Sequence, residues 1–260
     1  MIPAAFTLLH GFLGVPEFWH PIVHLLRPEF PEAQFHLPAL PGHNRVHEPA
    51  ENVFLPDSFP SAAAWYTRQI PETSPVVGIG YSMGARLTLG AALAHPSAFN
   101  CLVLISVHPG IACKGERTDR QQWEARMAEI AIRDGMTSLV TEFEKMPIFQ
   151  SQASLPKEVW ARQHRQRLSH HPEQIAAALP ILGLGHTPAM TASLKALNIP
   201  ILFISGENDR KYTQIAAELS QLRDAFHHAI IPGAGHNTVL EQPDDTATAI
   251  TSFFGRAVLS

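Results

Sequence analysis

The chain has 260 residues, a formal net charge of −4 and only two cysteines. A single α/β domain of this length buries enough apolar surface to fold without disulfides or metal ions. The small negative charge gives no reason to expect nucleic acid or an anionic membrane as a partner, and two cysteines are too few for a disulfide framework. We therefore expect a cytoplasmic protein.

Apolar runs that favour strands alternate along the chain with segments that favour helices. Strands are expected near residues 6–9, 34–37, 76–80, 102–106, 201–205 and 228–231, and helices near 19–26, 58–69, 83–94, 212–220 and 244–254. The first run leads directly into His10-Gly11, which indicates a strand rather than a signal peptide. Because the strand runs do not alternate with polar residues, they predict an α/β fold with a mostly parallel, doubly wound sheet.

One long interval contains no convincing strand. Residues 111–196 are rich in charged, helix-favouring residues and are too many for an ordinary crossover connection. We expect a helical cap at 111–196, inserted between two strands of a core formed by residues 1–110 and 197–260. Such a cap would cover the C-terminal ends of the strands, where ligands bind in open α/β sheets.

The segment Gly80-Tyr81-Ser82-Met83-Gly84 matches the G-x-S-x-G pattern between an expected strand and an expected helix. The serine of this pattern lies on a turn so tight that its neighbours must lack side-chain bulk. The turn presents the hydroxyl at a helix N-terminus, where N–H groups and the helix dipole favour negative charge. Ser82 is therefore the predicted reactive residue.

A serine hydroxyl needs a partner that accepts its proton, and that partner needs a carboxylate to orient it. On this scaffold the chain order is serine, acid, histidine. Asp209 follows the expected strand at 201–205, and His236 lies on the glycine-rich loop after 228–231. We predict a Ser82–His236–Asp209 triad. Asp209 is also a candidate N-cap for the next helix, and Glu207 is a competing candidate for the acid.

A developing oxyanion needs two N–H donors. Met83, the residue after the serine, supplies one, and Phe12 in the loop after the first strand is expected to supply the other; a plain strand-end turn is the alternative. Arg86 lies one helical turn after Ser82 on an otherwise small and apolar helix. A guanidinium there is costly unless it meets an anion, either a structural carboxylate or a substrate carboxylate.

These residues resemble a known family. The chain is similar to the α/β-hydrolase superfamily along essentially its full length and, within it, to the 2-succinyl-6-hydroxy-2,4-cyclohexadiene-1-carboxylate (SHCHC) synthase family. The resemblance rests on His10-Gly11-Phe12, Gly80 to Arg86, His108-Pro109-Gly110, Glu116-Arg117-x-x-Arg120, Pro147-Ile148-Phe149, Gly206-Glu207-x-Asp209-x-Lys211-Tyr212 and Ala234-Gly235-His236-Asn237. The arginine pattern distinguishes this family from the rest of the superfamily, because G-x-S-x-G and the Gly-His pair are shared by the whole superfamily.

The resemblance implies a lyase without metal or organic cofactor. Such an enzyme eliminates pyruvate from a carboxylate-rich cyclohexene intermediate in menaquinone or phylloquinone biosynthesis, so its partner is a small anionic molecule. The substrate-binding residues that the resemblance implies are His10, Tyr81, Arg86, Arg117, Phe143 and Arg167. Arg162 and Arg165 are alternatives to Arg167, and Phe143 stands where the family commonly has tryptophan. A carboxylesterase or C–C-bond hydrolase that uses the triad covalently is the competing hypothesis. Only nine residues precede His10, so the usual leading strand pair is expected to be missing or much reduced.

Overall fold

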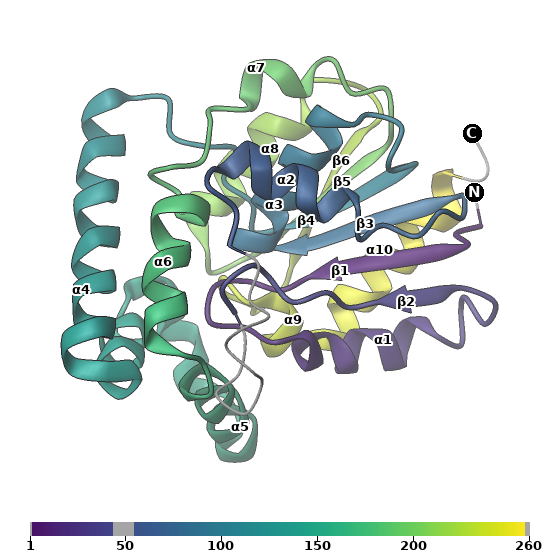
Figure 1. Ribbon diagram of the computed structural model, residues 1–260. Coiled ribbons are helices and arrows are strands. Elements are labelled where there is room, and N and C mark those ends of the chain that lie inside the picture. The colour runs from purple at the N-terminus through teal and green to yellow at the C-terminus, as the bar shows by residue number, and fades with distance from the viewer. Residues whose placement is uncertain (1, 44–54, 258–260) are drawn as a thin grey trace.

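The computed structural model describes residues 2–43 and 55–257. Six strands form one sheet in the order β2-β1-β3-β4-β5-β6, and every neighbouring pair is parallel. The strands are β1 (Ala5–Leu9), β2 (Gln34–His36), β3 (Val76–Tyr81), β4 (Cys101–Ile105), β5 (Ile201–Gly206) and β6 (Phe226–Ile231). All six expected strands are present, and the predicted α/β fold with a parallel sheet is confirmed (Figure 1).

Helices cover both faces of the sheet. The core helices are α1 (His20–Leu26), α2 (Phe59–Thr67), α3 (Met83–Ala94), α8 (Arg210–Ser220), α9 (Thr238–Glu241) and α10 (Pro243–Ala257), with a 3-10 turn η1 (Pro16–Trp19) before α1. Apolar residues of α1 and α10 pack in one buried cluster, whereas those of α2, α3 and α8 pack in another. Figure 1 shows these two groups on opposite sides of the strands. The sheet is therefore doubly wound.

The four inner strands β1, β3, β4 and β5 are buried on both faces, as their unbroken apolar runs predict, whereas the edge strands β2 and β6 are partly exposed. In β1, Ala5 and Leu9 belong to the cluster under α2 and α3, whereas Phe6 and Leu8 belong to the cluster under α1 and α10. Side chains alternate between the faces of a strand, so a strand covered on both sides needs apolar residues at consecutive positions. This burial holds the strand ends, and the loops that follow them, in fixed positions.

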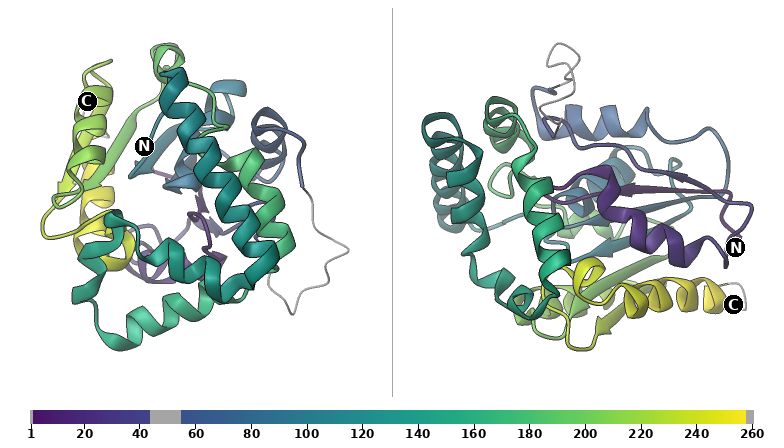
Figure 2. Two further views of the ribbon diagram at one scale, coloured as in Figure 1. Left: turned by 90° about the vertical axis from the view of Figure 1, so that its left-hand side faces the viewer. Right: turned by 90° about the horizontal axis from the view of Figure 1, so that it is seen from below.

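Between β4 and β5 the regular structure is entirely helical. This insertion contains α4 (Lys114–Glu144), the 3-10 segment η3 (Pro147–Ser154), α5 (Lys157–Leu168), α6 (Pro172–Leu182) and α7 (Thr191–Leu194). A third apolar cluster forms where α4 packs against α6, and the core contributes Leu13 to it. Figures 1 and 2 show α4, α5 and α6 gathered at one end of the sheet, away from the two chain termini.

The long helix α4 is broken at Gly135. This residue has φ 79° and ψ 178°, so the helix stops there and restarts at Met136. Such a backbone conformation is essentially restricted to glycine. The break redirects the second half of α4, residues 136–144, toward the loops at the strand ends, where Phe143 packs against Phe12 with ring centroids 5.3 Å apart.

None of the helices in the described part of the chain is both long and apolar enough to cross a lipid bilayer.

Candidate active site

Ser82 lies on a strained turn between β3 and α3. Its backbone has φ 52° and ψ −107°, and its N–H donates to the Ile105 carbonyl at 2.9 Å. A Cβ on Gly80 would lie 2.5 Å from the Ala85 Cα, and one on Gly84 would collide with the Leu9 carbonyl. The two glycines of the motif are therefore required by close backbone contacts, and the turn projects the serine hydroxyl out of the sheet.

Ser82, His236 and Asp209 form a continuous hydrogen-bonded chain. The Ser82 Oγ lies 3.2 Å from His236 Nε2, and His236 Nδ1 lies 2.6 Å from Asp209 Oδ2. Both His236 and Asp209 are buried. Because the carboxylate can only accept, Nδ1 carries the proton toward Asp209 and leaves Nε2 free to accept the serine proton.

The two competing interpretations of the acid are both resolved by the geometry. Asp209 is the N-cap of α8, since its Oδ1 accepts from the Tyr212 N–H at 3.4 Å, while its other oxygen meets His236. Glu207 instead accepts from the Gly233 N–H at 2.8 Å. Asp209 thus combines the cap with the contact to the imidazole, and Glu207 supports the histidine loop from the outside.

The loop that carries His236 is held from both sides. Ser106 donates its hydroxyl to the His236 carbonyl at 2.7 Å, and Ser106 itself has a left-handed backbone with φ 49°. The Glu241 carboxylate accepts from the Gly235 N–H at 2.6 Å and from the Asn237 N–H at 3.1 Å. The backbone on either side of the imidazole is therefore fixed by hydrogen bonds that do not involve the ring.

Two backbone amides near Ser82 are unoccupied. The N–H groups of Phe12 and Met83 have no hydrogen-bond partner among the described residues, and both residues line the pocket next to Ser82. Met83 begins α3, where the helix dipole favours negative charge. The predicted pair of donors is therefore available to an oxyanion next to Ser82.

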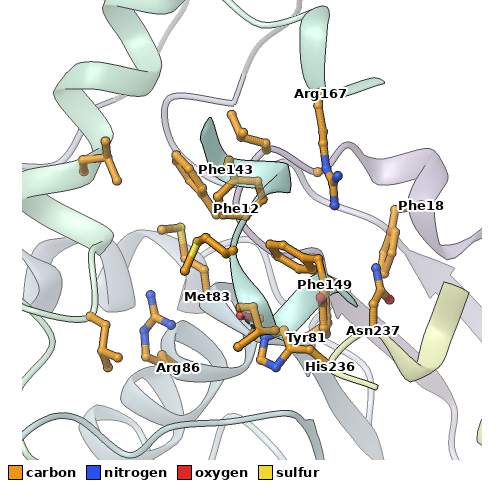
Figure 3. A pocket seen from close by; sticks show the side chains of 18 of the residues that line it. Phe12, Phe18, Tyr81, Met83, Arg86, Phe143, Phe149, Arg167, His236 and Asn237 are labelled. Atoms are coloured by element: carbon orange, nitrogen blue, oxygen red, sulfur yellow. Dashed lines mark hydrogen bonds between the residues drawn. The ribbon is translucent and has the colours of Figure 1, made fainter. Parts of the chain in front are cut away.

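The pocket above Ser82 has an apolar middle and charged sides. It contains about 830 Å³ of space free of protein atoms, counted out to its open mouth. Figure 3 shows Phe12, Phe149 and Met83 between Arg86 on one side and Arg167 on the other, with Tyr81 and His236 at the base. The core loops form its floor, and residues of α4, η3 and α5 form its roof. Such a site suits a ligand with an apolar body and separated anionic groups.

Arg86 is buried without a carboxylate. Its Nε donates to the Thr187 hydroxyl at 3.2 Å and its Nη2 to the Leu182 carbonyl at 2.9 Å. Among the described residues, no carboxylate lies within ion-pair distance of this guanidinium. Desolvation lowers the pKa of Arg86 to about 10, a value at which the side chain is still cationic at neutral pH. Of the two sequence-based alternatives, the structure therefore favours a substrate anion over a structural carboxylate.

The arginines of the insertion differ in whether they line the pocket. Arg167 lines the pocket, lies 5.2 Å from the Phe149 ring centroid, and is held by Glu144 at 2.8 Å. Arg162 and Arg165 are exposed and do not line it. Arg117 is also outside the pocket, since both its Nε and Nη2 donate to the Ile111 carbonyl. Arg120, one turn further along α4, lines the pocket instead.

The other predicted ligands fall into two groups. Tyr81 and Phe143 line the pocket, and desolvation holds the pKa of Tyr81 well above its usual value, so the phenol stays neutral. His10 does not line it. Its Nε2 accepts from the Leu40 N–H at 3.1 Å and its Nδ1 donates to the Gly11 carbonyl at 2.9 Å, so both ring nitrogens are used within the protein. His10 thus shapes the loop that presents Phe12 and is not placed to touch a ligand.

Several residues without a sequence-based site prediction complete the pocket. They are Phe18, Arg120, Trp123, Glu124, Phe149, Gln163, Gln166, Tyr212 and Asn237. Tyr212 packs on the His236 ring with centroids 4.5 Å apart. Most of this set comes from the insertion, where no local motif marks which helix face meets the sheet. Within the described ranges, no group of three or more His, Cys, Asp or Glu side chains is placed to hold a metal ion.

The parallel sheet, the strained serine turn and the hydrogen-bonded Ser–His–Asp chain define a class of protein. The model of the alpha/beta hydrolase family matches residues 8–249. The chain belongs to the alpha/beta hydrolase family.

More specific similarities were found to individual proteins. The 2-succinyl-6-hydroxy-2,4-cyclohexadiene-1-carboxylate synthase of Enterobacter sp. (strain 638) is 28% identical, over 94% of this chain and 89% of the relative. The structure of MenH from S. aureus superposes with a TM-score of 0.87 at 28% identity, over 97% of this chain and 93% of that one. A thermophilic esterase from Thermogutta terrifontis has a TM-score of 0.79 at 24% identity, over 97% and 89% of the two chains, a likeness that shows the fold alone.

Proposed function

We propose that the protein is a lyase that eliminates pyruvate from a carboxylate-rich cyclohexene intermediate to form SHCHC in menaquinone or phylloquinone biosynthesis. The observation that carries this proposal is a pocket in which an activated serine lies between Arg86 and Arg167. Hydrolysis of a neutral ester has no use for two buried cations. The SHCHC synthase relatives, which match nearly the whole chain, support the same reaction.

In the proposed mechanism Ser82 acts as a base and not as a covalent nucleophile. His236 Nε2 draws the proton from Ser82 Oγ while the oxygen removes a proton from a ring carbon of the substrate. That C–H bond and the bond to the leaving pyruvate group break, and a ring double bond forms. Asp209 stabilises the imidazolium, and the N–H groups of Phe12 and Met83 stabilise the enolate-like charge. The proton on His236 then returns to solvent or to the leaving group.

The remaining features of the proposal concern the surroundings of the reaction. Residues 111–196 serve as a cap that closes the site over the core of residues 1–110 and 197–260. The partner is a small anionic molecule, with neither nucleic acid nor membrane involved, and the location is cytoplasmic. The pocket lining, which draws on both core and insertion, supports the cap assignment.

Direct assay tests this proposal. The protein is incubated with the cyclohexene intermediate, and pyruvate is measured with a coupled dehydrogenase, while a p-nitrophenyl ester is assayed in parallel. We expect pyruvate release, and we expect Arg86→Ala to lower it at least about a hundredfold, as loss of a buried charge-assisted contact predicts, while small neutral ester hydrolysis changes little. Arg133→Ala serves as the control, because Arg133 is exposed and its ion pair, in the part of the chain that the structure describes, is with the neighbouring Asp134.

The competing function is a serine hydrolase with the same three residues. The free donor pair and the Ser82–His236 distance of 3.2 Å suit covalent acyl transfer equally well. Brisk ester cleavage without pyruvate release, together with equal losses of activity in Arg86→Ala on all substrates, would favour this hydrolase and remove the lyase assignment.

A further inference from the structure

One loop of the insertion contacts arginine-bearing helices on both of its sides. The 182–187 loop follows α6, and Arg86 of α3 donates to its Leu182 carbonyl and to its Thr187 hydroxyl. On the other side of the loop, the Gly185 carbonyl accepts from Gln121 of α4 at 2.9 Å. The Gly185 N–H points to the carboxylate of Glu124, also on α4, at 3.2 Å. The loop therefore connects a core helix with the first helix of the insertion.

Glu124 is the central acidic group of this connection. Its side chain is 1% exposed, lines the pocket, and accepts from Arg120 Nε at 2.7 Å. The carboxylate occupies the space beside Gly183 and Gly185, since a Cβ on Gly183 would collide with Oε2 and one on Gly185 would lie 3.0 Å from it. Backbone atoms are close as well, since the Leu179 carbonyl oxygen is 2.5 Å from the Cβ position of Gly183 and the Gln121 nitrogen is 2.9 Å from that of Gly185, so no larger residue fits at either glycine.

Stability alone does not account for this carboxylate. Removing a charge from water costs more than a buried ion pair usually returns, and well-packed apolar residues often replace such pairs without loss. The compensation for a fully buried acid is poor, because Arg120 is 30% exposed on its side chain and the Gly185 N–H adds only one neutral donor. Glu124 lines a pocket that also contains arginines, so its carboxylate is placed to act on the ligand-binding groups.

The pair leaves donors of a pocket-lining arginine without a partner in the described part of the protein. Glu124 takes the Nε of Arg120, and the Trp123 ring lies 4.4 Å under its guanidinium carbon, so the plane of the guanidinium is fixed. The terminal nitrogens of Arg120 have no partner among the described residues. The negative charge of Glu124 also acts on Arg86, whose pKa it raises against the effect of burial.

We propose that Glu124 sets the anion selectivity of this pocket. It is a positioning residue that fixes Arg120 and the 182–187 loop, so that Arg86 of the core and Arg120 of the insertion meet a ligand in a defined arrangement. Its charge offsets one of the pocket arginines and so limits how many carboxylates the site accepts. The inference rests on the proposed function only in taking carboxylates as the ligands.

The test compares Glu124→Gln with Glu129→Gln, which makes the same charge change on an exposed residue of the same helix. Dissociation constants for succinate and for propane-1,2,3-tricarboxylate are measured by calorimetry and by ligand-induced thermal shift. We expect Glu124→Gln to change the ratio of the two constants in favour of the tricarboxylate by at least about fivefold, because one repulsive charge is removed at close range. Glu129→Gln should leave that ratio unchanged.

A kinetic readout separates positioning from structural support. In pyruvate release, Glu124→Gln should lower kcat about tenfold, because Arg120 is no longer held in place, while KM does not rise. Glu124→Asp keeps the charge but draws it back by one methylene, so it should keep the wild-type selectivity ratio and still lower kcat. If Glu124→Gln fails to fold, the aspartate variant still decides, since a wild-type kcat in it would contradict the positioning role and a changed ratio would contradict the charge argument.

The outcomes distinguish this inference from the function on which it rests. An unchanged selectivity ratio in Glu124→Gln, or a wild-type protein that binds neither carboxylate up to the solubility limit, would overturn the role of Glu124. A wild-type protein that discriminates the carboxylates but releases no pyruvate would overturn the lyase assignment and leave the role of Glu124 standing.

Discussion

Two serines at this site carry the same kind of backbone strain. Ser82 and Ser106 follow neighbouring parallel strands, and both have left-handed φ values, 52° and 49°. Strain of this kind persists only where the surroundings impose it. For Ser82 the surroundings are the tight turn, whereas Ser106 donates its buried hydroxyl to the carbonyl of His236. Ser106 therefore positions the histidine loop without touching the ring.

Two substitutions of Ser106 distinguish the effect of its hydroxyl on turnover from the effect of its backbone conformation on stability. We expect Ser106→Ala and Ser106→Gly to lower turnover equally, about tenfold or ~1.4 kcal/mol in the barrier, because each leaves the His236 carbonyl without its donor. Their stabilities should differ, since glycine accepts the left-handed φ at low cost and alanine does not. Steady-state kinetics and urea denaturation measure the two effects. A Ser106→Gly variant with wild-type turnover would refute the positioning role.

Glycine positions give a second prediction at this scale. A methyl group on Gly84 would collide with the carbonyls of Leu9, at the end of β1, and of His10, the next residue, and these backbone atoms cannot move aside easily. Gly84→Ala should therefore lower the free energy of unfolding by about 1–3 kcal/mol or more, as overpacking does. Gly255 in α10 has open space around it, so Gly255→Ala should be neutral or stabilise by roughly 0.5–1 kcal/mol. Urea denaturation of both variants checks the opposite signs.

At the scale of elements, the break in α4 determines where the insertion meets the core. Gly135 has nothing within 4 Å of its missing Cβ, so the requirement for glycine comes from its φ of 79° and not from packing. Gly135→Ala should cost about 1–3 kcal/mol of stability and should displace residues 136–144. Because Phe143 lines the pocket and Glu144 holds Arg167, we expect KM for the intermediate to rise several-fold.

The matched control lies on the same helix. Gly115 has helical geometry near the start of α4, and its Cβ would meet only the Cys113 sulfur at 4.0 Å. Gly115→Ala should leave KM unchanged and should not lower stability. A Gly135→Ala variant with the KM of wild type would show that the break in α4 does not set the position of the pocket wall.

The sequence predicted the core elements well because each carries a local signal. The four inner strands are apolar runs, α3 begins at Met83 as expected, and the triad residues all follow strand ends. The insertion was predicted only as helical. Its contribution to the pocket depends on a glycine break and on how α4 packs against α6, and neither is encoded in a local pattern. The resemblance implied Arg117 as a ligand contact, whereas Arg117 donates to the Ile111 carbonyl and Arg120 lines the pocket.

At the scale of the whole molecule, three buried histidines lie where the core meets the insertion. His10 comes from the loop after β1, His43 from the loop after β2, and His170 from the turn between α5 and α6. The His10 and His43 rings are 5.5 Å apart, and those of His43 and His170 are 5.4 Å apart. A positive charge on any of them would be desolvated and would repel its neighbours. Acid pH should therefore lower the folding stability of the protein through the histidines at this junction.

The predicted pH dependence follows from the direction of the shifts. Burial lowers the pKa of His10 to about 3 and that of His43 well below its usual value of 6.5. Above pH 6.5 neither the folded nor the unfolded form binds a proton at these sites, so they do not make the free energy of unfolding depend on pH. Between pH 6.5 and about 3 only the unfolded chain becomes protonated, and stability falls as the pH falls. At pH 5 the loss is roughly 2 kcal/mol for a residue such as His10.

Urea denaturation at several pH values between 8 and 5 measures this effect. We expect the free energy of unfolding to be flat from pH 8 to 7 and to decline below pH 6.5. His43→Asn removes one titrating group while its amide can still donate to the Pro41 carbonyl, as His43 Nδ1 does at 3.1 Å. That variant should be less stable at pH 7, because it leaves a cavity, and should show a shallower decline toward pH 5. If the free energy of unfolding declines equally with pH in the variant and in the wild type, protonation of the histidines at this junction does not cause the loss of stability.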